Sequence, residues 1–453
     1  MQRSLMVFYA GSRCADDLLR VSVLPMEKAE QPFGPRALEL LRAGPFRRYI
    51  LGSAVSDTGT WMQVMAQAWV MSSLTDKALL LGMVNFAAGI PTIALTMVGG
   101  SAADRYDKRK ILIAAQIIQS ILAAILGTLV LTGLIQVWHV IVLAACLGVC
   151  IAFEMPAISA LVPELVQREQ IATAVALDRS VFHGSRLVGP SVAGMLVAWV
   201  GAASAFFVNA ASFFALMIAL ISLPARKVGT AEEEEQRRSG FKEGLRYVRQ
   251  DRTILCMIGL IALTTIFIFP FLSVMLPLYV RNILHLGPDR MGLLMAVSGI
   301  GSLTGSLGLL SVARSLRFRF MTIAAVVVSC ALFAMSRVAD FTLTAIAMGI
   351  LAIALSLNFG LAGTIVQERA PAHLRGRISA VFGLSFFGLM PIAGLLTTGL
   401  SDLIGMRAAL AVASVFFGAG ALFVMNLAKR NVDGVPVETA PAPEPAPAPV
   451  SVH

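Results

Sequence analysis

The chain has 453 residues, of which 57% are hydrophobic and 14% charged, and its mean hydropathy is +0.80. A soluble globular protein carries about 25% charged residues, so this chain has too few charges to cover a water-facing surface. These figures exclude collagen-like, disordered and disulfide-scaffold proteins, and they predict a chain that lies mostly in lipid. A net charge of +10 is typical of membrane proteins whose cytoplasmic loops hold Lys and Arg, so no nucleic-acid partner is inferred.

The chain begins with a segment, 1–45, that we expect to be cytoplasmic. Charges interrupt any signal-peptide core within 1–25, and Met26 precedes a more ordinary amphipathic stretch, so we expect 1–25 to be a start-site artefact. Twelve apolar stretches follow, each near the roughly 20 residues that cross a bilayer. They cover 49–71, 79–101, 111–133, 137–161, 174–200, 203–223, 255–280, 290–313, 319–337, 341–363, 378–401 and 405–427.

A polar segment, 224–254, separates the stretches into two groups of six. Within it, Phe241, Leu245 and Val248 share one helical face. This spacing predicts an amphipathic helix at the membrane surface, and a partner-binding helix is the alternative. The last residues, 429–453, are rich in Pro and Ala and predict a disordered tail. The predicted membrane domains are six-helix bundles over 46–223 and 255–428.

Basic residues are concentrated in alternate loops. The loops at 102–110, 313–319 and 369–377 and the central segment hold most of them. The loops between these hold few: Lys77, Arg281, Arg290, Arg337 and Arg407. Because basic loops stay on the cytoplasmic side, both termini are predicted to be cytoplasmic in a multi-pass protein of the bacterial inner membrane.

The two groups of stretches resemble each other at one junction. The chain reads LVPELVQREQIATAVAL after the fourth stretch and IVQERAPAHLRGRISAV after the tenth. Each places an acidic residue, Glu164 or Glu368, before a basic loop and a helix that contains Gly and Pro. Related six-helix halves are typical of transporters whose site lies between the halves.

The loop after the second stretch combines a small residue with opposite charges. Gly100 would let helices approach closely, and Asp104 and Arg105 would join helix ends by charge. An ordinary basic loop would explain Lys108 and Arg109 equally well. Together, GSAADRYDKRK resembles the G-x-x-x-D-R-x-x-R/K-R signature of the major facilitator superfamily. The resemblance implies that this loop is a gate between transport states.

Further motifs point to one branch of that superfamily. GTWMQ, FEMPAISALVPELV, SRLVGPSVAG and EGLRYVR, with ADRYDKRK, resemble the siderophore and drug exporters related to the enterobactin exporter, the transmembrane secretion effectors. The resemblance covers roughly 46–430. It implies an all-α membrane protein with twelve helices in two pseudo-symmetric bundles, a small-molecule substrate and protons as the coupling ion. It also implies contact with membrane lipid and an outer-membrane or periplasmic export partner.

The same resemblance assigns gate residues beyond the loop. Glu154 follows the pattern of relatives in which an acidic group pairs with the loop arginines, so it is expected to pair with Arg105 or Arg109. A solvated carboxylate is the alternative. Asp178 and Arg179 enter the fifth stretch at the same depth and would extend this network. The fourth stretch lacks the Arg that proton-coupled drug antiporters carry there, so coupling by that route is not expected.

Two charged residues lie deep in apolar stretches. Asp57 and Arg186 are each far from a predicted helix end, where a charge is costly unless it is paired or faces water. We expect both to face the internal cavity, with Asp57 as the proton carrier; a fixed ion pair between helices is the alternative. Gln63 and Gln67, four residues apart, share a helical face and are predicted to line the same cavity, as is Asn358.

The fifth stretch contains a reduced form of the superfamily's antiporter motif, made of Gly184, Gly189, Pro190 and Gly194. The resemblance favours export over import, although helix packing alone would also explain these small residues. Several phenylalanines predict an aromatic cavity, with lipid-facing packing as the alternative for each. They are Phe269, Phe271, Phe382, Phe386 and Phe387.

The predicted function is therefore secondary active export of a small amphipathic molecule by alternating access. A transporter of lysophospholipid-like molecules and a non-transporting membrane sensor are the alternatives. We expect no catalytic residues, because the chain contains no P-loop and no G-x-S-x-G or H-E-x-x-H motif. No cofactor or metal site is expected either, since the five cysteines form no C-x-x-C pair.

Overall fold

The computed structural model describes residues 40–42, 44–223, 241–371 and 374–433. The proposed start-site artefact at 1–25 lies outside these residues, as do the acidic part of the central segment and most of the Pro/Ala-rich tail. Within the described residues all regular structure is helical, which confirms the predicted all-α class.

The first half contains six long helices and one short 3₁₀ turn, and these cover the first six predicted stretches. They are α2 (Gly44–Leu74), α3 (Ala78–Arg105), α4 (Lys108–Leu131), α5 (Val137–Glu164), η1 (Arg168–Gln170), α6 (Ile171–Val200) and α7 (Ala202–Ile221).

The second half begins with the predicted amphipathic helix, α9 (Phe241–Gln250), and covers the other six stretches. The seventh stretch is α10 (Arg252–Phe267), the π-helical turn η2 (Phe271–Met275) and α11 (Leu276–Asn282). The rest are α12 (Pro288–Gly308), η3 (Leu309–Ser311), η4 (Arg314–Leu316), α13 (Arg317–Arg337), α14 (Phe341–Arg369), α15 (Arg375–Phe387), α16 (Met390–Ile404) and α17 (Met406–Asp433).

Ten stretches of the described chain are long and apolar enough to cross a membrane. The two long helices that do not meet this test are α2 and α6, with 31 and 30 residues. Both carry charged residues at mid-length, Asp57 on α2 and Arg186 on α6. Charged side chains within the membrane almost always face the interior of a helix bundle, where they mark functional sites. The charged faces of α2 and α6 are therefore candidates for the functional site.

Aspartates begin several helices. Asp107 accepts a hydrogen bond from the backbone N–H of Arg109 (3.0 Å) at the start of α4, and Asp251 accepts from Thr253 (2.9 Å) at the start of α10. The first backbone N–H groups of a helix have no acceptor within the helix. These aspartate side chains accept hydrogen bonds from such N–H groups, which lipid could not do.

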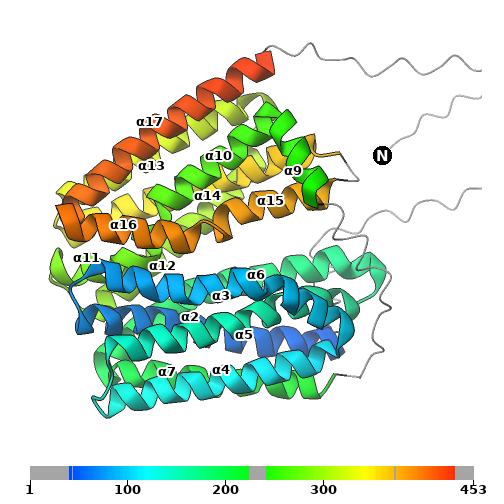
Figure 1. Cartoon of the computed structure of the whole chain (residues 1–453), viewed down its shortest axis with the longest axis vertical. Coiled ribbons are helices and arrows are strands. Elements are labelled where there is room, and N and C mark those ends of the chain that lie inside the picture. The colour runs from blue at the N-terminus through cyan, green and yellow to red at the C-terminus, as the bar shows by residue number, and fades with distance from the viewer. Residues whose placement is uncertain (1–39, 43, 224–240, 372–373, 434–453) are drawn as a thin grey trace, which may run out of the picture.

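The helices form two groups. In Figure 1, α2–α7 lie in the lower part and α10–α17 lie above them. In the first, α3 packs on α5 and α7 packs on both α2 and α4; in the second, α14 packs on α12 and α13, and α17 packs on α10 and α13. The loops at 106–107, 165–167 and 370–371 share one end of the molecule, called the basic end below. The loops at 75–77, 283–287 and 338–340 share the opposite end.

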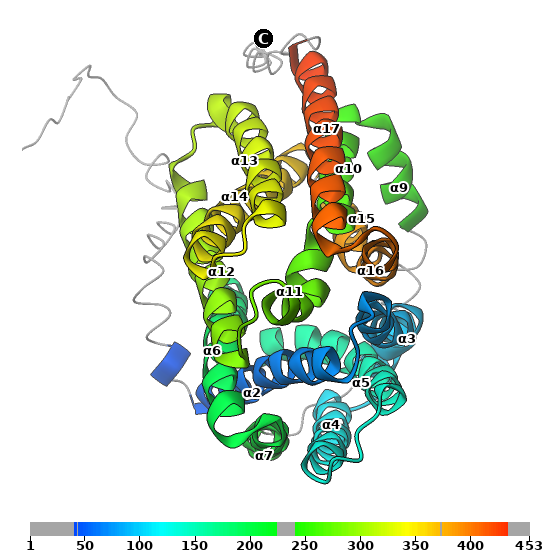
Figure 2. The same cartoon turned by 90° about the vertical axis from the view of Figure 1, so that its left-hand side faces the viewer.

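The two halves meet along two helix pairs, α6 with α12 and α3 with α16. Figure 2, seen from the opposite end, shows both pairs side by side. A Cβ added at Gly194 of α6 would lie 2.8 Å from the carbonyl oxygen of Pro288, and one at Gly89 of α3 would overlap Pro391 of α16. Small residues thus let the halves approach at backbone distance.

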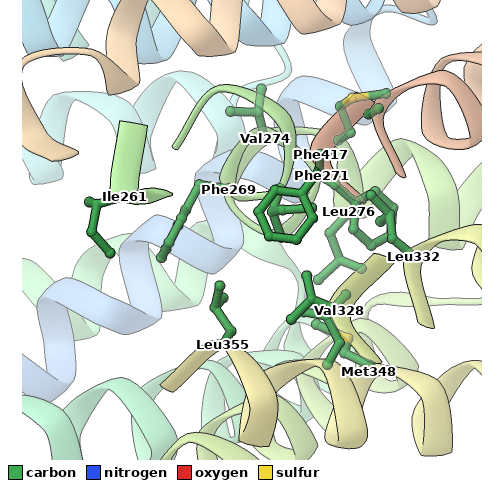
Figure 3. Close-up of a cluster of buried hydrophobic side chains, with 14 of the residues drawn as sticks. Ile261, Phe269, Phe271, Val274, Leu276, Val328, Leu332, Met348, Leu355 and Phe417 are labelled. Carbon is green, nitrogen blue, oxygen red and sulfur yellow. The ribbon is translucent and has the colours of Figure 1, made fainter. Parts of the chain in front are cut away.

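The largest buried hydrophobic cluster extends through the second half. Figure 3 shows part of it, with Phe271 and Leu276 of the η2–α11 segment near Val328, Leu332 and Met348. Val248 of α9 is buried in the same cluster, where α9 packs on α10 and α15. The amphipathic helix therefore lies against the second bundle through its apolar face.

Candidate functional site

The segment with the sequence GSAADRYDKRK, residues 100–110, is called the motif loop below. It joins the first turn of α4 to the ends of two other helices. Lys108 Nζ forms a 3.0 Å ion pair with Glu164 Oε1 at the end of α5. Arg109 Nε donates to the carbonyl oxygen of Leu220 (3.1 Å) at the end of α7. A pocket of about 500 Å³ lies beside the loop, lined in part by Arg105, Tyr106 and Lys110. The loop thus connects three helices of the first half at the basic end.

Gly100 is not the point of close helix approach that the sequence analysis predicts. A Cβ added there would meet nothing within 4 Å, whereas one at the preceding Gly99 would overlap the carbonyl oxygen of Ala152 on α5. A Cβ at Gly148 of α5 would likewise overlap the carbonyl oxygen of Ala88. Neighbouring helix positions point about 100° apart, so Gly99 and Gly148 bring α3 and α5 together while Gly100 faces open space.

Glu154 does not form the predicted ion pair with Arg105 or Arg109. Its carboxylate oxygens accept hydrogen bonds from Gln116 Nε2 and Gln119 Nε2, each at 2.7 Å. Ser56 Oγ of α2 donates to Gln116 Oε1 (3.2 Å). Glu154 therefore belongs to a buried polar network between α2, α4 and α5. The sequence does not show this network, because it does not show which faces of these helices meet.

Asp178 of α6 and Asp57 of α2 both accept hydrogen bonds from side chains of α2. Tyr49 of α2 donates its hydroxyl to Asp178 Oδ1 (2.9 Å), and Ser53 Oγ donates to Asp57 Oδ2 (3.0 Å). Asp178 thus fastens α6 to α2, whereas the neighbouring Arg179 is exposed.

Arg186 lies against an aromatic ring. Its guanidinium carbon is 5.2 Å from the ring centroid of Trp61 on α2, and Trp61 in turn meets Phe182 edge-on at 5.8 Å. In the described part of the chain no carboxylate forms an ion pair with Arg186. The alternative of a fixed Asp57–Arg186 ion pair is therefore not the arrangement found.

Two of the three predicted amide residues do not line a shared cavity. Gln63 is 7% exposed and accepts a 2.8 Å hydrogen bond from Asn209 of α7. Asn358 is 2% exposed, and its amide lies 3.1 Å from backbone groups of Met321 and Ala325 on α13. Both face the interior of their own bundle, because a buried amide needs hydrogen-bond partners that neighbouring helices supply. Gln67 remains half-exposed.

The antiporter-like motif on α6 contacts both halves. A Cβ at Gly189 would lie 2.7 Å from the carbonyl oxygen of Thr58 on α2, and one at Gly194 would lie 3.0 Å from Cα of Gly292 on α12. Pro190 is buried between them, whereas Gly184 has open space around its Cβ position. Gly189 and Gly194 are thus close-packing residues, and Gly184 is not one in this structure.

Five phenylalanines of the second half form one aromatic cluster. Phe386 lies 4.5 Å from Phe269 and 5.4 Å from Phe359 between ring centroids, and Phe359 lies 5.6 Å from Phe382. Phe359 was not among the predicted residues. Phe387 lies 4.9 Å from Phe386 between ring centroids and is 66% exposed. Phe271 instead packs edge-on against the buried Tyr279 at 5.4 Å.

The predicted resemblance between halves extends to their ion pairs. Glu368 at the end of α14 accepts from Arg317 Nη1 (2.8 Å) at the start of α13, and it also pairs with Arg314 (3.1 Å). Glu164 and Lys108 occupy the same places on α5 and α4. The repeated acidic residue thus joins equivalent helices at the basic end of each half.

The opposite end carries polar contacts between the halves that the sequence analysis missed. Asp402 of α16 accepts hydrogen bonds from the backbone N–H groups of Ala78 (2.7 Å) and Leu79 (2.9 Å) at the start of α3. Arg281 of α11 pairs with Asp76 (3.2 Å) and also donates to the carbonyl oxygen of Ser72. We call these contacts the end latch. Its residues looked like ordinary loop charges in the sequence.

The sequence profile of the transmembrane secretion effectors matches residues 36–449. The chain belongs to this family of the major facilitator superfamily. Among its relatives is the multidrug efflux pump Tap of Mycolicibacterium fortuitum, which is 24% identical over 87% of this chain and 99% of its own length. Macrolide efflux protein A of Streptococcus pyogenes is 23% identical over 79% of this chain and 89% of its own length.

Solved structures share the fold of this transmembrane secretion effector. A bacterial homologue of the human lysosomal transporter Spinster, in an inward-facing and occupied conformation, has a TM-score of 0.65 and 14% identity over 85% of this chain and 97% of its own. An inward-facing bacterial homologue of the iron transporter ferroportin has a TM-score of 0.65 and 16% identity over 85% of this chain and 98% of its own. The fold is therefore that of the major facilitator transporters.

Proposed function

We propose that this chain exports a small amphipathic molecule by alternating access. The observation that carries the proposal is the end latch, in which Asp402 of one half caps a helix of the other. Such a contact closes one end of the molecule and must break if that end is to open. The named efflux activities of Tap and macrolide efflux protein A support a drug-like cargo rather than a siderophore.

We place the protein in the bacterial inner membrane with both termini on the cytoplasmic side. The basic end is then cytoplasmic, in accord with the positive-inside rule, and the end latch closes the external side. The bundles at 46–223 and 255–428 rock against each other as units. The motif loop, with Asp104, Arg105 and Lys108, and the nearby Asp178 and Arg179 form the cytoplasmic gate.

The transport test uses inverted membrane vesicles, in which export becomes uptake. Vesicles that contain the full chain are energised and supplied with ethidium, rhodamine 123 or fluorescein, with and without a proton uncoupler. At least one dye is expected to accumulate above the level of vesicles that lack the protein. Accumulation of none of them would contradict a drug-like cargo.

Asp57→Asn is expected to abolish gradient-driven accumulation. Asp57 is the carboxylate at mid-length of α2. Among the described residues it accepts one side-chain hydrogen bond, from Ser53 (3.0 Å), and no basic residue pairs with it, so it is placed to take up and release a proton. Uptake by the variant should fall to the level of uncoupled vesicles. Asp289→Asn, at an exposed carboxylate paired only with its neighbour Arg290, serves as the control. If dye uptake by the Asp57→Asn variant still falls when the uncoupler is added, Asp57 is not the proton carrier.

A further inference from the structure

Helix α6 carries two exposed stripes on opposite faces. Val188, Val192, Met195 and Trp199 form an apolar stripe that reaches 82% exposure at Trp199. Arg179, His183 and Arg186 are also exposed, and their spacing of four and three residues places them on the other side of the helix. Lipid accepts the first stripe and excludes the second, so the three basic residues face away from the membrane.

The neighbours of α6 show where this basic stripe lies. On one flank, Thr58 of α2 donates to Ser185 Oγ (3.1 Å). On the other flank, a Cβ at Gly299 of α12 would lie 2.7 Å from Leu187. Because α2 belongs to the first half and α12 to the second, the basic stripe lies along the boundary between the halves.

The acidic groups near the stripe are engaged within the first half. Asp178 is bonded to Tyr49, Asp57 to Ser53, and Glu154 to two glutamines. The stripe therefore presents positive charge without a bonded carboxylate on Arg186. A guanidinium without a carboxylate partner is a strong donor for carboxylate, sulfonate or phosphate oxygens.

Aromatic rings surround this charge at a similar depth. Trp61 lies beside Arg186, and Phe182 meets Trp61 edge-on. Arg186 is about 23 Å from the basic end of α6, and Phe386 is about 17 Å from the basic end of α15, at 1.5 Å per residue. The phenylalanine cluster of the second half thus lies at a comparable depth, about one helical turn nearer the basic end.

We propose that the cargo is an amphipathic anion. Its acidic group binds Arg186, with Arg179 nearer the basic end as the entry charge, and its aromatic part lies between Trp61 and the cluster of Phe269, Phe359 and Phe386. This inference rests on the proposed export function and names the class of substrate that the function would carry.

The test is dye binding to the purified full chain in lipid nanodiscs, measured by fluorescence anisotropy. The probes are fluorescein, an anion, and rhodamine 123, a cation with the same xanthene ring system. Fluorescein is expected to bind more tightly. Arg186→Gln should weaken fluorescein binding about tenfold, the effect of one charge-assisted hydrogen bond, and should not weaken rhodamine 123 binding.

The matched control is Arg337→Gln, which removes a guanidinium stacked 5.3 Å from Phe333 at the opposite end. It should leave the binding of both dyes unchanged. Tighter binding of rhodamine 123 to the unmodified protein would overturn the proposal. So would an Arg186→Gln variant that binds fluorescein normally or loses both dyes equally, because the arginine would then only pack on Trp61.

Vesicle uptake separates this inference from the export function. Binding that discriminates the dyes by charge, without gradient-driven uptake of either, would reject export and leave the anion site standing. Uptake of rhodamine 123 but not fluorescein would leave export standing and reject the anion site.

Discussion

Replacing Gly99 by alanine is expected to destabilise the protein, whereas the same change at the adjacent Gly100 is expected to stabilise it slightly. At Gly99 the added Cβ overlaps the carbonyl oxygen of Ala152, and a backbone atom moves only with its helix, so the cost should be about 2 kcal/mol, within the range for overpacking. At Gly100 the Cβ meets nothing, and alanine gains about 0.8–1 kcal/mol in helix propensity.

Each variant adds one methyl group to α3, and the two differ only in its position. Each is therefore the control for the other. The measurement is thermal unfolding in detergent: after heating, size-exclusion chromatography gives the fraction of protein that remains monodisperse. Comparing this fraction between the variants gives their order of stability. Gly148→Ala should behave like Gly99→Ala, because its Cβ overlaps the carbonyl oxygen of Ala88 on the same helix pair. Equal stability of Gly99→Ala and Gly100→Ala would show that α3 and α5 do not touch at Gly99.

Removing the Asp402 part of the end latch with Asp402→Ala is expected to favour opening of the opposite end. Asp402 caps α3 from the other half, and Lys77, which precedes α3, makes no capping bond of its own. Loss of a cap and of a negative charge near a helix start costs about 2 kcal/mol. Only the closed state loses this energy, so the ratio of open to closed molecules should rise about 30-fold.

The measurement is the distance between spin labels at Leu134 and Ala339, which lie in loops of the two halves at that end. Both are replaced by cysteine in a background without native cysteines, and double electron–electron resonance reports the distribution. Asp340→Ala is the control, since Asp340 caps its own helix by accepting from Leu343 (2.9 Å). If both variants lengthen the distance equally, or neither does, the latch does not hold the halves together.

The twelve helical stretches and their all-α class could be predicted because lipid imposes a local rule. Every backbone group must be satisfied within its own helix, so each crossing is a continuous apolar stretch that the sequence displays directly. The breaks in the seventh and eleventh stretches were less visible: α10 gives way to a π-helical turn at Phe271, and α15 ends at Phe387 before Pro391.

The candidate site was predicted less completely. Arg186 was placed at depth in the fifth stretch, and the structure adds Trp61 as its neighbour. Glu154 was assigned to the wrong partners, and Gln63 faces Asn209 instead of a cavity. Hydropathy reports the depth of a polar residue but not its direction around the helix axis, where one position turns a side chain by about 100°.

The sequence by itself determined that lipid is the solvent, where each helix runs and which loops hold the charge, because these properties depend on residues close together in the chain. Only the tertiary structure decided that Gly99 is the contact rather than Gly100, that Asp402 caps a helix 324 positions away, and that α6 lies between α2 of its own half and α12 of the other. These depend on the rotation and pairing of helices, which distant residues set together. The few charges that a chain of 14% charged residues keeps within its helices thus acquire their partners, such as Tyr49 for Asp178 and Gln116 for Glu154, only when the helices of a bundle pack together.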